Sequence, residues 1–129
     1  MINIYTDGAS SGNPGPGGFG VILHSGKHYK EISEGYRKTT NNRMELLAVI
    51  TGLESIKNPG QEIMIYSDSK YIIDSVEKRW VFNWVRTNFK DKKNKDLWLR
   101  FLEVYKQHKI RFTWVKGHNG HPENERCDE

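Results

Sequence analysis

A near-repeat of four residues, at two distant points of the chain, limits its fold more than any other feature. Ile4-Tyr5-Thr6-Asp7 and Ile65-Tyr66-Ser67-Asp68 each run from a β-branched residue through an aromatic and a hydroxyl residue to an aspartate. Both segments predict the end of a strand, and the hairpin and helix patterns between them allow a crossover that makes the two strands parallel. Matched positions of neighbouring strands lie about 4.8 Å apart, so we expect both carboxylates at the carboxyl edge of one sheet.

The other hydrophobic patterns predict an α/β fold with a mixed sheet. Alternating, β-rich segments predict strands at 2–6, 19–23, 29–33, 62–67 and 110–115. Apolar stripes of helical period predict helices at 42–57, 69–77 and 97–108. Residues 8–18 are rich in glycine and proline and predict a loop, and the aromatic, basic segment 80–95 is expected to be partly helical. The second and third strands form an antiparallel hairpin, crossovers place the others parallel to the first, and 129 residues fit one domain.

Basic charge is concentrated in the second half of the chain. Residues 78–116 contain 12 Lys and Arg against 3 Asp and Glu, whereas the rest of the chain contains 8 and 13. This asymmetry fits a polyanionic partner and, equally, an ordinary solvated face. The longest apolar run is too short to cross a membrane, no secretory signal follows Met1, and Cys127 is the single cysteine. We therefore expect a cytoplasmic protein without disulfides.

Glu45 is a candidate third carboxylate beside Asp7 and Asp68. We place it at the margin of the apolar stripe, in the first turn of the helix predicted at 42–57. For each acid alone, a turn, an N-cap or a favourable interaction with the helix dipole is a respectable alternative. Three converging acids make an oxygen-rich site that fits Mg²⁺ or Mn²⁺ better than zinc, and a bound cation relieves their repulsion.

One glycine motif has the wrong context for its usual function. Residues 15–20 satisfy G-x-G-x-x-G but run into a predicted strand instead of opening a helix. The dinucleotide-binding interpretation therefore fails.

The chain closely resembles the bacterial ribonuclease H type 1 family over nearly its whole length. The matching segments are Thr6-Asp7-Gly8, Gly12-Asn13-Pro14-Gly15-Pro16-Gly17-Gly18, Thr39-Thr40-Asn41-Asn42-Arg43-Met44-Glu45-Leu46, Ser67-Asp68-Ser69, Trp114-Val115-Lys116-Gly117-His118 and Gly120 to Glu129. They occur in the order typical of the family, which makes a chance similarity untenable.

The resemblance implies a five-stranded mixed sheet flanked by helices and endonucleolytic cleavage of the RNA strand of RNA/DNA hybrids, which leaves 5′-phosphate and 3′-hydroxyl ends. It assigns metal binding to Asp7, Glu45, Asp68 and Asp128, and a mobile catalytic role to His118. Two divalent ions, Mg²⁺ or Mn²⁺, would activate a water and stabilise the leaving oxygen. For His118 alone, a surface loop histidine is the ordinary interpretation. We expect the chain to act as a monomer.

The resemblance also implies contacts with the hybrid. It assigns minor-groove contacts to Asn13, Asn41 and Asn42, whose amides suit recognition of a 2′-hydroxyl; helix capping is the alternative for Asn41 and Asn42. Segment 80–95 is similar to the basic protrusion with which many bacterial members grip the DNA strand. Its candidate contacts are Trp80, Trp84, Arg86, Lys90, Lys92, Lys93 and Lys95. We expect the two tryptophans to pack and the lysines to contact phosphates.

Two departures from the family pattern affect the expected site. Lys70 stands where many bacterial relatives carry glutamine, so this substrate contact differs. The chain ends at Glu129, one residue after Asp128, where family members continue with a helix that anchors the aspartate. We therefore expect a single domain, 1–129, that lacks this helix, and an Asp128 that holds metal less firmly.

Two other functions are compatible with such a chain. One is a non-catalytic module that binds hybrids, which the intact Asp7, Glu45 and Asp68 disfavour. The other is a DNA exonuclease or resolvase of the same fold, which the Asn pair and the basic segment disfavour.

Overall fold

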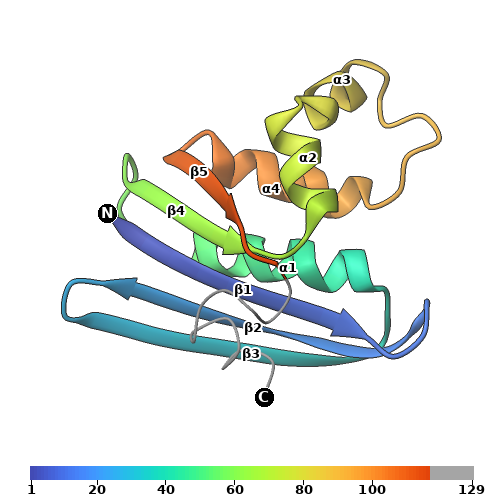
Figure 1. Cartoon of the computed structure of the whole chain (residues 1–129). Coiled ribbons are helices and arrows are strands. Elements are labelled where there is room, and N and C mark those ends of the chain that lie inside the picture. The colour runs from blue at the N-terminus through green and yellow to red at the C-terminus, as the bar shows by residue number, and fades with distance from the viewer. Residues whose placement is uncertain (117–129) are drawn as a thin grey trace.

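The computed structural model describes residues 1–116 and contains one five-stranded sheet with helices packed against it (Figure 1). The strands are β1 (Ile2–Ser10), β2 (Gly15–Ser25), β3 (His28–Thr39), β4 (Glu62–Ser67) and β5 (Lys109–Trp114). The helices are α1 (Asn41–Glu54), α2 (Lys70–Glu77), α3 (Trp80–Arg86) and α4 (Lys95–Tyr105). The strand order is β3-β2-β1-β4-β5. β2 is antiparallel to β1 and β3, whereas β4 is parallel to β1 and β5, so the predicted mixed sheet is confirmed.

The two near-identical tetrapeptides lie side by side in register. Ile4 pairs with Ile65 and Tyr5 with Tyr66, as expected for parallel neighbours. The rings of Tyr5 and Tyr66 stack with their centroids 4.6 Å apart. Asp7 follows two residues after Tyr5 in β1, and Asp68 follows two residues after Tyr66, directly beyond the end of β4.

The predicted loop at 8–18 is wrong at both ends. β1 runs on to Ser10 and β2 begins at Gly15, because the two strands continue to pair beyond the point where β4 ends. Asp7 therefore lies inside β1, opposite Gly20, and not at the strand's end. Glycine in this stretch predicts a turn from sequence. Here, however, the absence of a side chain allows the backbone of a neighbouring element to come close to the strand.

Gly8 lets α1 lie directly against β1. A Cβ atom at this position would come within 2.5–2.7 Å of backbone atoms of Met44 and Glu45, closer than atoms can pack. The residue after Asp7 therefore touches the backbone of Glu45, and glycine is required there.

Helix α1 is buried on nearly all sides, because it packs on β1 and β2 and also on α4. Its buried side chains include Leu46, Ala48, Val49, Ile50 and Leu53, each fully or almost fully removed from solvent. The helix ends at Glu54, three residues before the predicted end. The hydroxyl of Thr40 caps its N-terminus by accepting from the Arg43 N–H at 3.2 Å, so the alternative that Asn41 or Asn42 caps this helix is wrong.

The segment predicted as partly helical forms α3 and then a turn. Asn88, Phe89, Asp91 and Asn94 all have positive φ in this turn, and α4 begins at Lys95, two residues before the predicted start. Figure 1 shows α2, α3 and this turn projecting beyond the β5 edge of the sheet. Within residues 1–116, no helix has the length and apolar character needed to cross a membrane.

Candidate active site

Glu45 is an acid of the site whose pKa is shifted by its surroundings. Its side chain is half-buried, and the amide nitrogen of Asn41 donates to Oε1 at 2.9 Å. Burial raises the pKa of Glu45 above its usual value and the negative charge of Asp68 raises it further, whereas hydrogen bonds with Ser69 and Asn41 oppose the rise. The two carboxylates are thus near enough for the charge of Asp68 to disfavour ionisation of Glu45. Because α1 begins at Asn41, Glu45 lies just beyond the first turn, and the prediction of a first-turn position is wrong.

Asp68 occupies the junction between β4 and α2 and is half-buried. The residue that caps α2 is Ser69, whose hydroxyl accepts from the Ile72 N–H at 3.2 Å, so an N-cap function for Asp68 is wrong. The backbone carbonyl of Asp68 accepts a hydrogen bond from the Trp114 indole at 3.3 Å. Strand β5 thereby holds the backbone of the residue that carries this carboxylate.

Asp7 reaches the same region from β1. Its Oδ2 atom is shielded from solvent, and its neighbour Gly8 contacts the backbone of Glu45. The structure therefore brings β1, β4 and the start of α1 together at one edge, as the tetrapeptides predicted.

The donor chemistry of this edge fits a hard divalent cation. The available ligands are carboxylate oxygens, and a cation between Glu45 and Asp68 would offset the repulsion that raises the pKa of Glu45. Across residues 1–116, no group of three or more Asp, Glu, His or Cys side chains is gathered tightly enough to hold a metal ion by itself. The closed three-acid cluster expected from the sequence is thus not formed within this range. Mg²⁺ ordinarily binds one or two carboxylates together with waters and substrate phosphates, so the arrangement suits an ion that arrives with substrate.

The three predicted asparagines have different surroundings. Asn13 is exposed in the turn between β1 and β2. Asn41 accepts from the Ser10 N–H at 3.3 Å while its amide holds Glu45, so it ties the end of β1 to the acid. Asn42 is exposed and borders a hollow of about 350 Å³ that it shares with Tyr71, Trp80, Trp84 and the lysines of the following turn.

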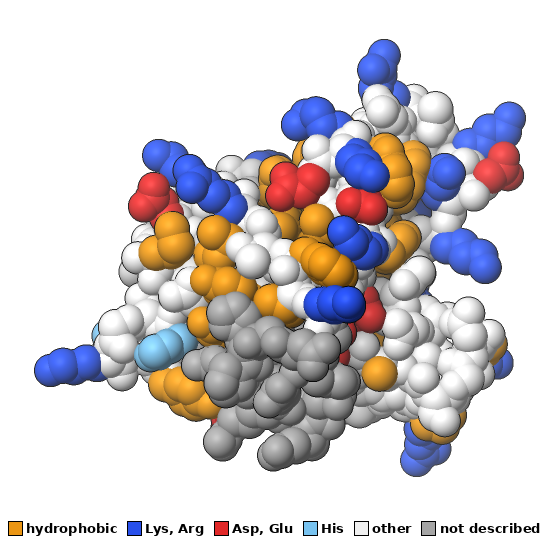
Figure 2. All heavy atoms as spheres, in the orientation of Figure 1, with side chains coloured by type: hydrophobic (Ala, Val, Ile, Leu, Met, Phe, Trp, Pro, Cys, Tyr) orange, Lys and Arg blue, Asp and Glu red, His pale blue; other side chains and the backbone are white. Residues whose placement is uncertain are grey.

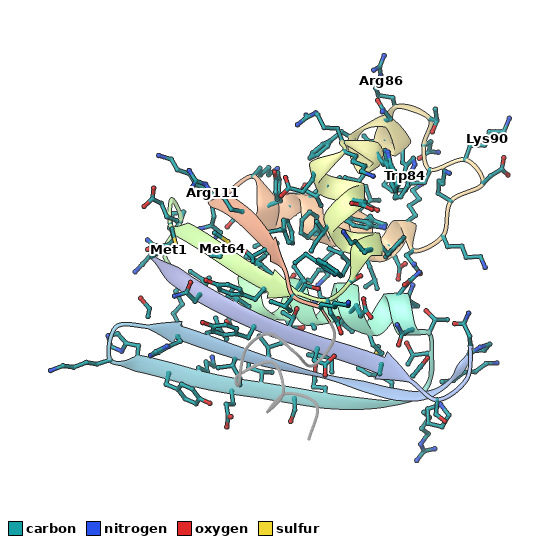
Figure 3. The ribbon with its side chains drawn as sticks, viewed as in Figure 1. Met1, Met64, Trp84, Arg86, Lys90 and Arg111 are labelled. Atoms are coloured by element: carbon teal, nitrogen blue, oxygen red, sulfur yellow. The ribbon has the colours of Figure 1, made fainter. Side chains whose placement is uncertain are left out.

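The basic segment forms a lobe beside this hollow. Figure 2 shows Lys and Arg side chains around α2, α3 and the turn after α3, and Figure 3 shows Arg86 and Lys90 pointing away from the body of the protein. The predicted basic contacts, Arg86, Lys90, Lys92, Lys93 and Lys95, are all exposed. Trp84 packs against Phe89 and Trp98, which confirms its packing function. Trp80 is 42% exposed, so the prediction that it packs is wrong.

Two predicted catalytic residues, His118 and Asp128, lie outside the described residues. One contributor was missed: Trp114, the last residue of β5, which contacts both Asp68 and Lys70. The available signal was that the predicted strand at 110–115 ends at the same edge as the strand before Asp68.

Comparison with known proteins gives concordant matches over the whole chain. The family model described as RNase H matches residues 1–129. Ribonuclease H of Desulforamulus reducens is 53% identical over 134 residues, which cover 99% of this chain and 83% of the relative. Ribonuclease HI of Haemophilus ducreyi is 51% identical over 133 residues, covering 99% of this chain and 86% of the relative.

Solved structures also match this chain over almost its whole length. LC9-RNase H1, a type 1 RNase H with the type 2 active-site motif, superposes with a TM-score of 0.86 at 30% identity, over 98% of this chain and 68% of that chain. LC11-RNase H1, solved in complex with RNA/DNA hybrid, superposes with a TM-score of 0.72 at 25% identity, over 99% of this chain and 91% of that chain.

Proposed function

This chain belongs to the RNase H family, and we propose that it is a divalent-metal-dependent endoribonuclease that hydrolyses the RNA strand of RNA/DNA hybrids. The products would carry 5′-phosphate and 3′-hydroxyl ends. The observation that supports the proposal is the parallel pairing of the two tetrapeptides through Tyr5 and Tyr66, after which Asp7 and Asp68 each follow at the second residue, together with the contact of Gly8 with the backbone of Glu45.

The acids of this edge are the proposed metal ligands. Asp7, Glu45 and Asp68 would hold two ions, Mg²⁺ or alternatively Mn²⁺, together with Asp128 from outside the described residues. When bound, the cations supply activation of a water and stabilisation of the leaving 3′-oxygen in an in-line displacement at phosphorus. The protein's own contribution at Glu45 is the hydrogen bond from Asn41, which orients the carboxylate and opposes the rise in its pKa. His118 is proposed to assist proton transfer.

An enzyme selective for a hybrid must recognise the 2′-hydroxyl, which only the RNA strand carries. Asn13 and Asn42 are exposed, and an amide both donates to and accepts from a hydroxyl. Asn41 already holds Ser10 and Glu45, so its function in this proposal is mainly to position the acid.

The exposed cations beside the hollow are proposed to hold the DNA strand through its phosphates. Such contacts give affinity that decreases steeply with salt and carries no sequence information. Trp80, which is exposed beneath Lys78 with the ammonium 5.4 Å from its ring, is placed to stack on the nucleic acid. A monomeric state and a cytoplasmic location belong to the same proposal; the single cysteine of the sequence is compatible with a reducing compartment.

One assay separates this function from its alternatives. Labelled RNA/DNA hybrid, duplex RNA and duplex DNA are incubated with Mg²⁺ and the protein or its Asp68→Asn variant. Cleavage of only the RNA strand of the hybrid, abolished in the variant, supports the proposal. Binding without cleavage would instead indicate a non-catalytic module, and cut DNA would indicate a DNA nuclease of the same fold.

A further inference from the structure

Trp114 is a large aromatic side chain left 43% exposed at the end of β5, next to the acids. Its position is fixed by the sheet, because Trp114 pairs with Ser67 and the next N–H, that of Val115, donates to the Ser67 carbonyl at 2.9 Å. An exposed indole leaves apolar surface in contact with water, so it contributes little to the hydrophobic stabilisation of the fold. Its two polar contacts give the reason for its presence.

The first contact is with the catalytic edge. The indole N–H of Trp114 donates to the backbone carbonyl of Asp68 at 3.3 Å. This bond ties the junction between β4 and α2 to β5, so the carboxylate of Asp68 projects from a backbone that is held on two sides.

The second contact is with Lys70. The ammonium of Lys70 lies 4.2 Å from the centroid of the Trp114 ring, within the range of a cation–π interaction. Because the lysine stem is flexible, this contact restricts where its charge can lie. The ammonium is thereby held over the same indole that hydrogen-bonds to the backbone of Asp68.

Lys70 is not placed there to stabilise its helix. It is the first residue of α2, where the helix dipole disfavours a positive charge, and it is exposed. None of the salt bridges formed within residues 1–116 involves it. A cation held at an unfavourable helix position and directed by an aromatic ring beside the acids is suited to meet an external anion.

We propose that Trp114 is a positioning residue with two functions: it fixes the backbone of Asp68, and it directs the Lys70 ammonium to a phosphate of the hybrid next to the scissile one. The inference rests on the proposed function. The two functions are separable, because the first uses the indole N–H and the second uses the aromatic face.

The test compares Trp114→Phe, Trp114→Leu, Lys70→Gln and the double variant Lys70→Gln/Trp114→Leu with the wild type. We measure kcat and KM on RNA/DNA hybrid with Mg²⁺. We also measure hybrid binding in EDTA over a range of salt concentrations, which reports the phosphate contact without cleavage. Leu99→Ala is the matched control, because Leu99 is also a 43% exposed apolar residue but lies on α4.

Each variant has a distinct expected result. Trp114→Phe loses the N–H but keeps a ring, so kcat decreases by about fivefold while the salt dependence of binding is unchanged. Lys70→Gln weakens binding and lowers the slope of log affinity against log salt by about one, with kcat retained. Trp114→Leu does both, and the double variant lowers the slope no further than Lys70→Gln alone. Leu99→Ala behaves as wild type.

Failure of the inference is distinguishable from failure of the proposed function. If the wild type does not cut hybrid, the proposed function is wrong, whereas the binding arm still tests whether Trp114 directs Lys70. If the wild type cuts hybrid but Trp114→Phe keeps its kcat and Trp114→Leu keeps the wild-type slope, the positioning inference is overturned. Equal losses in Leu99→Ala would overturn it as well, because they would indicate a general effect on stability. Trp114→Phe and Lys70→Gln keep the test decisive should Trp114→Leu fail to fold.

Discussion

The side-chain amide of Asn41 donates to Oε1 of Glu45 at 2.9 Å while its oxygen accepts from the backbone of Ser10 at 3.3 Å. This single side chain joins the end of β1 to the acid of α1. It also favours the ionised form of Glu45, whose pKa burial and Asp68 raise. Asn41 therefore links the geometry of the site to its dependence on pH.

We expect Asn41→Ala to shift the acid limb of the pH–activity profile to higher pH. Loss of the donor raises the pKa of Glu45 further, so the ionised carboxylate that holds metal is lost at a higher pH than in the wild type. The pH dependence of kcat/KM with Mg²⁺ measures the shift. Asn13→Ala is the control, because Asn13 is an exposed asparagine of the β1–β2 turn and is not among the groups that shift the pKa of Glu45. An unmoved limb in Asn41→Ala would show that the hydrogen bond does not tune the acid.

We expect Gly8→Ala to destabilise the fold by about 1–3 kcal/mol, because its Cβ would overlap the backbone of Met44 and Glu45. Urea unfolding measures the loss, and activity should decrease as well because α1 is pushed away from β1. Gly35→Ala is a matched control in β3 of the same sheet: its Cβ would meet only the Gly17 carbonyl oxygen, at 3.8 Å. Equal stabilities of the two variants would contradict the close approach.

His108 should make stability depend on pH. Its Nδ1 accepts from the Gln61 N–H at 3.2 Å, and its Nε2 is buried with no hydrogen bond among residues 1–116. Burial lowers the pKa of His108 in the folded protein. As the pH falls, this histidine is therefore protonated in the unfolded chain at a higher pH than in the folded protein. The stabilisation is complete above the unfolded pKa of about 6.5 and is lost as the pH falls through the lower folded pKa.

The His108→Asn variant tests this dependence. Asparagine retains an acceptor near the position of Nδ1 but does not titrate, so the free energy of unfolding should lose this part of its decline below pH 6.5. His28→Asn, at the exposed start of β3, should keep the decline of the wild type. Parallel curves for wild type and His108→Asn would assign the pH dependence to other groups.

The turn after α3 offers a stabilising substitution. Asp91 is exposed with φ of 58°, a conformation that glycine adopts without the steric cost of a side chain. We expect Asp91→Gly to be more stable than Asp91→Ala by about 1 kcal/mol, as measured by thermal or urea unfolding. Both variants remove the same charge, so any change in hybrid affinity should be common to both. The difference between their free energies of unfolding then reports only the backbone conformation at this position.

Sequence patterns predicted the parts of this protein that depend on local periodicity. The strand at 62–67 and the parallel pairing of the tetrapeptides followed from alternation and from the crossover rule, and both are confirmed. The strand character of residues 8–10 and 15–18 was missed, because glycine at Gly8 meets a tertiary contact with α1 that no local pattern encodes. Trp114 was missed for the same reason: its contacts with Asp68 and Lys70 join segments that only the β4–β5 pairing brings together.

The burial of α1 has a consequence for how the protein responds to heat. Glu45 and Asn41 belong to the helix that is sandwiched between sheet and α4, so amide hydrogens there should exchange only when the whole domain opens. The lobe that contains α3 and its positive-φ turn has a single buried residue in its helix, Val81, and can open on its own at lower cost. Warming should therefore loosen the grip on nucleic acid before it disturbs the acids, so that KM rises at temperatures where kcat is still intact.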